Sequence, residues 1–272
     1  MKAVITAAGS GSRWFPVAAV LNKAMLPVGA VPVLQHLVAE LAGAGLTDIA
    51  VVLRPDDDLV PRYFSEDLDL RESFVRTGRL DRYEPVAAFH RSLRGLSLTW
   101  IRQQPAPYGS ACALLAARDW IGDDVWMAVS SDDLVLRAEG NDLADLAAAA
   151  AAVPSSTAVQ VVRVPPERVS ACGIVEVRQA AGRLELERLI EKPEPGRTDS
   201  DLCFVSRMVL GPGFLGTLDQ LPADPRTGEF VAAQAIDRYA RDHVVAVHQL
   251  AGRHFDCGSV SGWLDANLAV RA

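Results

Sequence analysis

Cysteine is scarce in this 272-residue sequence, which holds four, and none of them forms a C-x-x-C pair. Because disulfide frameworks and zinc clusters need grouped cysteines, neither is expected. The five histidines show no metal-ligand spacing, and no ordering of serine, cysteine and histidine indicates a nucleophilic triad. Cys257 in particular is interpreted as a small buried residue rather than a nucleophile.

Long apolar runs and an excess of positive charge are also missing. The longest apolar run, Leu146 to Val153, falls far short of the ~20 residues that a membrane span needs. Asp and Glu number 34 against 27 Lys and Arg, a net charge of −7 that argues against non-specific nucleic-acid or anionic-membrane binding. No charged segment followed by an apolar one opens the chain, so no signal peptide is expected. We therefore expect a cytoplasmic protein with no nucleic-acid or membrane partner.

The sequence does contain a strand–helix–strand pattern at its start. Residues 2–8 and 48–53 are continuous apolar strands, and the apolar positions of 33–44 have helical spacing. Such a unit implies a parallel sheet with a right-handed crossover. Further strands are predicted at 98–102, 125–129, 158–164, 173–177, 184–190, 202–210 and 244–250. Further helices are predicted at 111–120, 143–153, 213–219, 230–241 and 262–270.

Strands with hairpin-like spacing dominate after residue 150. The sequence therefore predicts one α/β domain: a mixed, mainly parallel central sheet flanked by helices, with an antiparallel-rich second half. Residues 55–95 are polar and hard to place in this scheme. Within them, the run Asp56-Asp57-Asp58 favours a solvated turn over a metal site.

A glycine-containing turn, Gly9 to Arg13, directly follows the first strand. Backbone N–H groups in such a turn can approach phosphates closely. The turn is not a dinucleotide fingerprint, because Trp14 stands where the third glycine would be, and it lacks the Gly-Lys-Ser/Thr ending of a P-loop. Arg13 and Lys23 place two cations near the turn, a set that suits a triphosphate. Alone, the segment also fits an ordinary tight turn.

Charged residues follow other strands as well. Asp132 comes just after the strand at 125–129, where ligands of open α/β sheets bind, and a carboxylate there can hold Mg²⁺. Asp256 is a candidate second metal ligand from the other half of the chain. Lys192, between Glu191 and Pro193, is placed to bind a second phosphate. Taken singly, each of these residues also fits a helix cap or a surface turn.

Taken in order, these motifs resemble the signature of the bacterial glucose-1-phosphate uridylyltransferases, within the sugar-phosphate nucleotidyltransferases. The N-terminal match runs from Lys2 through Gly9-x-Gly11-x-Arg13 to Lys23-x-Met25-Leu26-Pro27. It continues through Arg102-Gln103, Tyr108-Gly109, Gly122-Asp123, Asp132-Asp133, Cys172-Gly173-Ile174-Val175, Glu191-Lys192-Pro193, Gly228-Glu229 and Asp256-Cys257-Gly258. The resemblance covers nearly the whole chain.

The resemblance implies a Rossmann-like nucleotidyltransferase domain spanning 1–272, with a nucleotide-binding half at about 1–150 and a sugar-phosphate-binding half at about 151–272. It implies Mg²⁺-dependent transfer of a nucleoside monophosphate, UMP from UTP in the first instance, to a sugar 1-phosphate such as glucose 1-phosphate, releasing pyrophosphate. The implied nucleotide-binding residues are Ala8, Gly9, Gly11, Ser12, Arg13, Lys23, Gln103 and Gly109. The implied sugar-phosphate-binding residues are Gly173, Glu191 and Lys192, and the implied Mg²⁺ ligands are Asp132 and Asp256. Arg13, Lys23, Asp132 and Lys192 are the implied catalytic residues, and a homo-oligomer is expected by the same analogy.

This sequence departs from the family pattern around the base and the acceptor. Ala24 replaces a usual Glu, Ser131 a usual Pro, and Cys172 a usual Tyr, while residues 231–234 replace Gln-Leu-Thr-Asp. The loop before Gly109 is one residue shorter, so either Gln103 or Gln104 can read the base.

Two alternatives stay open. The first keeps the chemistry but uses a different NTP or a sugar-like or cyclitol phosphate acceptor. The second is a non-catalytic nucleotide-sugar-binding protein. The joint retention of Arg13, Lys23, Asp132, Lys192 and Asp256 argues against the second, because gathering charges in one cleft is costly.

Overall fold

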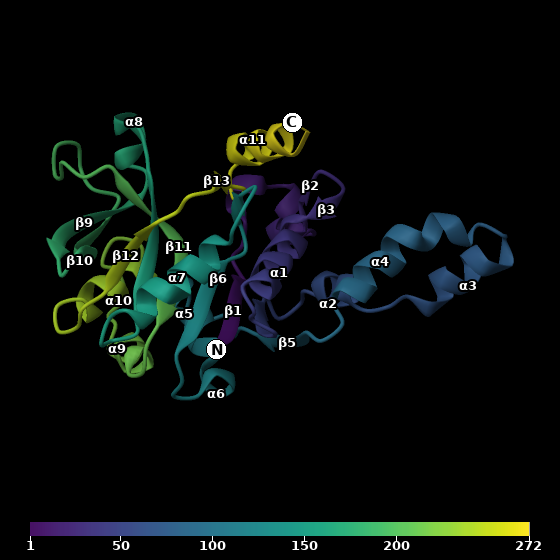
Figure 1. Cartoon of the computed structure of the whole chain (residues 1–272), viewed down its shortest axis with the longest axis horizontal. Coiled ribbons are helices and arrows are strands. Elements are labelled where there is room, and N and C mark those ends of the chain that lie inside the picture. The colour runs from purple at the N-terminus through teal and green to yellow at the C-terminus, as the bar shows by residue number, and fades with distance from the viewer. Residues whose placement is uncertain (272) are drawn as a thin grey trace.

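A mixed sheet of nine strands forms the centre of the computed structural model, which describes residues 1–271 (Figure 1). In spatial order the strands are β5 (Ser97–Arg102), β4 (Asp48–Leu53), β1 (Lys2–Ala7), β6 (Trp126–Ser130), β11 (Leu202–Leu210), β8 (Ala158–Arg163), β12 (Ala246–Gln249), β10 (Arg183–Glu191) and β9 (Gly173–Ala180). The first four are parallel to one another, whereas β11 runs antiparallel to both β6 and β8. The predicted parallel first half is confirmed.

Side-chain alternation along the parallel strands builds two hydrophobic layers. Ile5 of β1 packs into one layer and its neighbour Val4 into the other, and both side chains are fully buried. The first layer is closed by α1 (Val33–Gly43), α7 (Asp142–Ala151) and α11 (Val260–Arg271). The second layer is closed by α5 (Ser110–Ala116), α6 (Arg118–Ile121), α9 (Phe214–Asp219) and α10 (Ala232–Tyr239). Because both faces are covered, these strands read as continuous apolar runs in the sequence.

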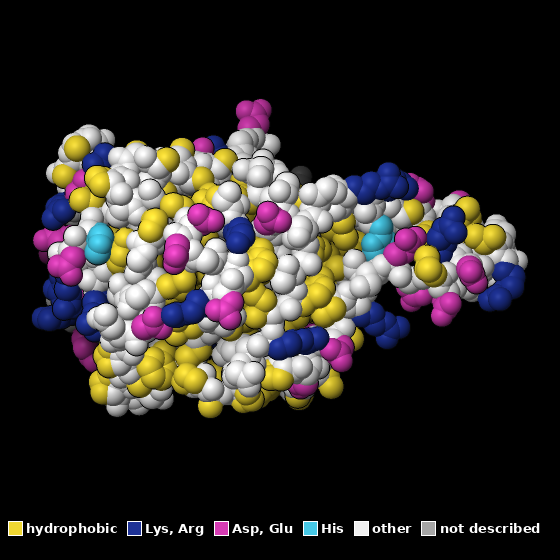
Figure 2. All heavy atoms as spheres, turned by 90° about the horizontal axis from the view of Figure 1, so that it is seen from below, with side chains coloured by type: hydrophobic (Ala, Val, Ile, Leu, Met, Phe, Trp, Pro, Cys, Tyr) yellow, Lys and Arg dark blue, Asp and Glu magenta, His cyan; other side chains and the backbone are white. Residues whose placement is uncertain are grey.

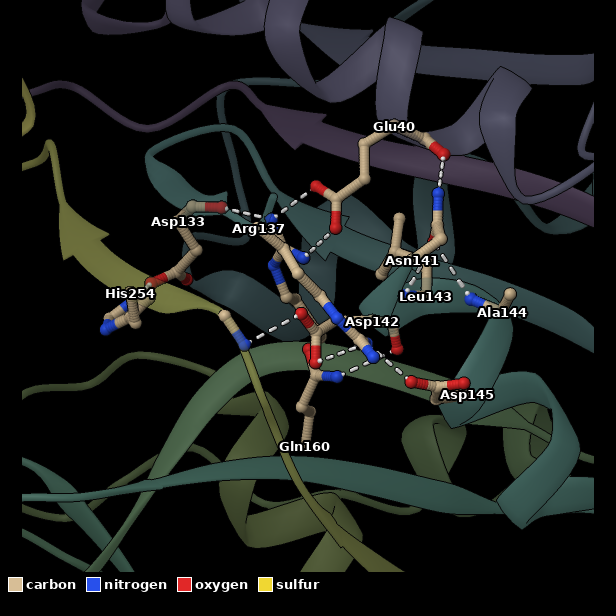
Figure 3. Close-up of polar contacts among 12 residues, drawn as sticks. Glu40, Asp133, Arg137, Asn141, Asp142, Leu143, Ala144, Asp145, Gln160 and His254 are labelled. Carbon is tan, nitrogen blue, oxygen red and sulfur yellow. Dashed lines mark hydrogen bonds and ion pairs between the residues drawn. The ribbon is translucent and has the colours of Figure 1, made fainter. Parts of the chain in front are cut away.

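The second half of the chain adds mostly antiparallel strands, as predicted. β9 and β10 form a hairpin whose register places Gly173 opposite Glu191. The exception is β12, which pairs in parallel with β8. A short helix, α8 (Pro166–Val169), precedes β9. Helix α7 begins at Asn141, whose side chain accepts hydrogen bonds from the Leu143 and Ala144 amides, as an N-cap residue does (Figure 3).

Residues 55–95, which the sequence left unplaced, form an arm of short helices that projects from the body (Figure 1). The helices are α2 (Leu59–Phe64), α3 (Leu68–Arg76), the 3₁₀ turn η4 (Leu80–Tyr83) and α4 (Glu84–Ser92). At its base, Phe64 packs against Phe89 of α4 and Trp100 of β5. Side chains of both charges lie among apolar ones on the arm (Figure 2). None of the described helices combines the length and apolarity of a membrane span.

Several short elements escaped prediction because they lack a periodic pattern. The predicted helix at 111–120 is divided between α5 and α6 at Ala117. Two small ladders join β2 (Pro27–Val28) to β3 (Val31–Pro32), and β7 (Asp133–Leu136) to β13 (Arg253–Asp256). Three 3₁₀ turns, η1 (Ser12–Trp14), η2 (Val17–Ala19) and η3 (Lys23–Met25), follow β1. These turns and the β7–β13 ladder carry most of the charged residues described next.

Candidate active-site cleft

A cleft of two connected chambers opens beyond the carboxyl ends of β1 and β6, where ligands of open α/β sheets bind. The glycine-loop chamber, about 650 Å³, is lined by Ala8, Gly9, Gln103, Tyr108, Gly109 and residues between 224 and 231. The β9 chamber, about 610 Å³, is lined by Cys172, Gly173, Cys203, Phe204, Met208, residues 231–233, His254 and Asp256. Arg13, Lys23, Glu191 and Lys192 line both chambers and so mark where they meet.

Two cations that line both chambers, Lys23 and Arg13, pair with two carboxylates of the β9 chamber. Lys23 Nζ donates to Asp132 Oδ2 at 2.5 Å, and Arg13 Nη1 donates to Asp256 Oδ2 at 2.9 Å. Arg13 Nη2 lies 3.8 Å from Asp132 Oδ2 and so links the two pairs. The four residues come from segments up to 243 positions apart in the sequence. The structure therefore brings together the two cations and two carboxylates that the sequence singled out.

Asp132 is held in its charged form. It is 7% exposed, and burial alone raises its pKa. The nearby Lys23 ammonium, the hydrogen bond from Ser130 Oγ at 2.6 Å, and Arg13 outweigh that effect and leave the pKa below its ordinary value. Asp132 is thus a carboxylate throughout the neutral pH range.

The carboxylates of Asp132 and Asp256 approach one point beside Gly258. A Cβ at residue 258 would lie 2.2 Å from Asp132 Oδ2 and 2.8 Å from Asp256 Oδ1, so only glycine leaves both oxygens in place. Two carboxylates provide the hard oxygen donors that Mg²⁺ prefers, and their pairing with Lys23 and Arg13 still leaves lone pairs to share. The donor set fits the predicted Mg²⁺ site.

Lys23 is fixed by a buried network that the sequence did not reveal. Asn22 Nδ2 donates to the Ala7 carbonyl at 2.8 Å and to Asp57 Oδ2 at 2.6 Å, while Asn22 Oδ1 accepts from the Ala24 amide at 2.9 Å. Asp57 is only 4% exposed. The interpretation of Asp56–Asp58 as a solvated turn is therefore wrong for Asp57, whose carboxylate ties the Lys23 turn to the end of β1.

The glycine-loop chamber contains most, but not all, of the residues predicted to bind nucleotide. Among the described residues, Gly11 and Ser12 belong to the turn but do not line the chamber. Gln103 is 8% exposed and lines it, whereas Gln104 is exposed and lines only an adjoining smaller cavity, which Gln103 also borders. Gln103 is therefore the amide positioned for the chamber.

Gly109 allows two backbone segments to meet at the wall of the glycine-loop chamber. Its φ is 133°, and a Cβ there would lie 2.3 Å from the Phe230 carbonyl oxygen. Phe230 N–H donates to the Tyr108 carbonyl, and the Phe230 carbonyl accepts from Ala111 N–H, both at 2.9 Å. The predicted Gly109 thus has a close-approach role, which brings the 224–231 segment to the chamber.

In the β9 chamber, Glu191 is the last residue of β10 and Lys192 follows it directly. Glu191 Oε2 lies 3.1 Å from where a Cβ of Gly173 would be, so these two predicted residues are in contact range. Lys192 adopts a left-handed φ of 47°, a strained conformation for a non-glycine residue, and its N–H donates to the Cys172 carbonyl at 2.9 Å. Its ammonium is exposed and lies 3.5 Å from Glu191 Oε1.

Asp133 pairs with His254 and not with Lys23 or Arg13. Its Oδ1 lies 2.6 Å from His254 Nε2 across the β7–β13 ladder, and its carbonyl accepts from Arg207. Arg207 is fully buried and forms a bidentate pair with Glu40 at 2.7 and 2.8 Å. Figure 3 shows these contacts around Glu40 and Asp133. A buried Arg in a strand indicates that a carboxylate partner exists, but the sequence alone does not indicate which carboxylate it is.

Asp142 anchors the turn that precedes the strand bearing Asp256. Its side chain is fully buried and accepts from the amides of Ala251 at 2.7 Å and Gly252 at 3.1 Å (Figure 3). The turn between β12 and β13 is thereby fixed to the start of α7.

Comparisons with known proteins give matches over nearly the whole chain. A family model described as nucleotidyl transferase matches residues 2–272. A UTP–glucose-1-phosphate uridylyltransferase of Pseudomonas aeruginosa is 27% identical over 266 residues, spanning 97% of this chain and 94% of that protein. A UTP–glucose-1-phosphate uridylyltransferase 2 of Streptococcus pyogenes is 27% identical over 272 residues, spanning 98% of this chain and 89% of that protein.

Solved structures give the same result. A UTP-bound UGPase from Acinetobacter baumannii has a TM-score of 0.87 at 26% identity, covering 99% of this chain and 92% of that one. An apo UDP-glucose pyrophosphorylase at 23% identity shares the fold, with a TM-score of 0.89 and coverage of 100% and 98%. Together with the family model, which covers nearly all of the sequence, these matches show that the chain belongs to the nucleotidyl transferase family.

Proposed function

We propose that this protein transfers UMP from UTP to glucose 1-phosphate, in a Mg²⁺-dependent reaction that forms UDP-glucose and releases pyrophosphate. The observation that carries the proposal is the convergence of Arg13, Lys23, Asp132 and Asp256 where two chambers meet, with Lys192 alongside. Such a site can take two phosphate-bearing molecules end to end. The similar proteins are named as UTP–glucose-1-phosphate uridylyltransferases, and these names support the choice of substrates.

The glycine-loop chamber is proposed to hold the nucleotide. The backbone groups of Ala8 and Gly9 and the amide of Gln103 line it, and an amide offers one donor and one acceptor, which match the edge of uracil. Arg13 and Lys23 also line it, and their positive charges suit the triphosphate. Gly11 and Ser12 are proposed to act through the shape of the turn that carries Arg13.

The β9 chamber is proposed to hold the sugar phosphate. Gly173 and Glu191 face each other on the β9–β10 hairpin and are placed to contact sugar hydroxyls. Lys192 lies beside them at the junction, where its ammonium can pair with the acceptor phosphate. The strained backbone of Lys192, fixed by the Cys172 carbonyl, keeps that side chain in reach of both chambers.

The chemistry needs charge and alignment rather than proton transfer. The acceptor phosphate is already an anion, so no general base is required, and the described cleft residues supply cations instead. Arg13 and Lys23 offset repulsion between the two anions and stabilise charge on the pyrophosphate that leaves. Mg²⁺ held by Asp132 and Asp256 would add neutralisation of the phosphate oxygens. Lys192 orients the attacking phosphate for in-line displacement.

A matrix of nucleoside triphosphates against sugar 1-phosphates, read by pyrophosphate release, tests this function. UTP with glucose 1-phosphate should be the best pair, and omission of Mg²⁺ should abolish release. Uracil and thymine differ by one methyl group, worth only ~1–3 kcal/mol in a tight pocket, so dTTP should react to some degree. A purine triphosphate that outperforms UTP would contradict the base assignment. No release with any pair would favour the non-catalytic alternative.

A different acceptor is the second candidate, and Cys172 favours it. This residue lines the β9 chamber where the family usually has Tyr, so the chamber lacks one ring. Cys172→Tyr should raise the preference for glucose 1-phosphate over bulkier hexose or cyclitol phosphates in the same matrix. An unchanged acceptor ranking would show that position 172 does not shape the acceptor site.

A further inference from the structure

Two thiols meet at the wall of the β9 chamber. Cys172 and Cys203 both line it, and both are free. Cys203 lies on β11 opposite Ile174, two residues after Cys172, so the strand pairing brings their backbones close. The Cys203 thiol donates to the Phe204 carbonyl at 3.6 Å. The strand register and the shared chamber wall therefore place both thiols side by side in the proposed acceptor site.

The two thiols differ in exposure and acidity. Cys172 is half-buried and faces the cleft, whereas Cys203 is 8% exposed. The adjacent Cys203 thiol lowers the pKa of Cys172 to about 7, with Arg168 contributing, and Cys172 in turn raises the pKa of Cys203. Burial instead raises the pKa of Cys257 to about 12. Cys172 thus has the accessible thiolate and Cys203 the resolving thiol that redox-sensitive pairs need.

We propose that Cys172 and Cys203 form a peroxide-sensitive dithiol whose oxidation to a disulfide closes the acceptor site. The Cys172 thiolate attacks one peroxide oxygen, which breaks the O–O bond and gives Cys172 sulfenic acid and one water. The Cys203 sulfur then attacks the Cys172 sulfur and forms the S–S bond, while the sulfenic oxygen leaves as a second water. Overall two S–H bonds are lost, the thiols give up two electrons, and one peroxide is reduced to two waters.

The consequence for the site follows from the position of Cys172. Its carbonyl holds the Lys192 N–H, and its neighbour Gly173 contacts Glu191. A covalent bond to Cys203 draws the 172–173 backbone toward β11 and so disturbs both groups proposed to hold the sugar phosphate. The glycine-loop chamber is not lined by either cysteine. Oxidation should therefore weaken the binding of the acceptor far more than the binding of UTP. This expected effect on activity rests on the proposed function.

The test compares reduced protein with protein treated with hydrogen peroxide and then freed of it. We expect the protein to lose the mass of two hydrogens and to give a peptide that links residues 172 and 203. The KM for glucose 1-phosphate should rise by at least about tenfold, which corresponds to the loss of one polar contact. The KM for UTP should change less than about threefold, and dithiothreitol should reverse both changes. Cys203→Ser should stop at a dimedone-reactive sulfenic acid on Cys172. Cys112→Ser, a buried cysteine on α5 outside the cleft, is the matched control and should respond as the unmodified chain does.

Absence of the 172–203 peptide from the peroxide-treated, unmodified chain overturns the dithiol. A linked protein with an unchanged KM for glucose 1-phosphate overturns the closure. If the reduced protein makes no nucleotide sugar from any substrate pair, the proposed function fails, while the peptide map still decides the dithiol independently.

Discussion

Replacing Asp132 by asparagine removes one negative charge from the middle of the cleft and changes the side chain's size very little. In the folded chain its Oδ2 accepts from Lys23 at 2.5 Å and its Oδ1 accepts from Ser130 at 2.6 Å. The amide keeps one acceptor oxygen, but it carries no charge and its other terminal atom becomes a donor. The variant therefore loses both the metal-binding charge and the charge that pairs with Lys23.

The magnitudes follow from burial. Loss of one preorganised electrostatic stabiliser lowers turnover by at least ~100-fold, or about 2.7 kcal/mol. Removing one member of a fully buried ion pair costs about 3–5 kcal/mol of stability. The Lys23 side chain keeps 16% exposure and borders the cleft, so water can reach it. We therefore expect a smaller loss of stability, about 2 kcal/mol, in the range of one charged hydrogen bond.

Pyrophosphate release with saturating Mg²⁺ and substrates measures the first effect, and chemical denaturation measures the second. Asp133→Asn is the matched control, because this neighbouring carboxylate contacts His254 instead. It should lose less than about tenfold in turnover, since it removes no charge from the junction of the chambers. Near-normal turnover of Asp132→Asn with Mg²⁺ present would refute the metal assignment.

The pH dependence has a definite sign. The folded-state pKa of Asp132 lies below the unfolded value of about 3.9, so its charge stabilises the folded chain at and above that pH. The stability is lost only as the pH falls through the lower folded-state pKa. The difference in unfolding free energy between the unmodified chain and Asp132→Asn should stay constant from about pH 8 to pH 5 and shrink below about pH 4. A difference that shrinks near pH 6 would contradict the pairing with Lys23.

Further predictions concern the rest of the cleft. In binding titrations, Lys192→Ala should weaken the binding of glucose 1-phosphate more than that of UTP, and Lys23→Ala should do the reverse. Each loss should be roughly 1.5 kcal/mol or more. Equal effects on both ligands would show that the two lysines do not serve different substrates. Gln103→Ala should raise the KM for UTP by about tenfold, whereas Gln104→Ala should leave it within about twofold, and the opposite result would exchange their roles. Asp57→Ala should lower the free energy of unfolding by about 1–3 kcal/mol, because one buried N–H of Asn22 loses its acceptor, and should raise the KM for UTP; an unchanged denaturation midpoint would contradict the network.

Local patterns were enough to predict the sheet and the charged residues of the cleft. Strands β1, β4 and β6 are largely apolar because both of their faces are covered, and Asp132 lies two residues after β6, so chain direction places it at the carboxyl edge of the sheet. The sequence also offered Asp256 as a second metal ligand, and the two carboxylates meet through β13. Residue type and position after a strand are local properties, and they locate most of the charged residues of the cleft.

The parts that escaped prediction depend on contacts between distant segments. Asp57 looks like a solvated carboxylate because its neighbours Asp56 and Asp58 are exposed, yet Asn22, 35 positions away, draws it inside. The arm at 55–95 is polar because few of its residues reach the core. Its sequence therefore lacks the apolar periodicity that would predict its helices. The contact between Cys172 and Cys203 depends on the pairing of β9 with β11, which no local pattern specifies.

Strand β11, from the second half of the chain, pairs with β6 of the first half on one side and with β8 of its own half on the other. Severing the chain near residue 150 would therefore leave an open edge on each fragment, and neither fragment should fold alone, although the two together should reassemble by strand complementation. Unfolding should accordingly be a single cooperative transition across all 272 residues. Because β6 and β11 pair within one continuous sheet, we expect the two chambers to keep their spacing when the proposed substrates bind.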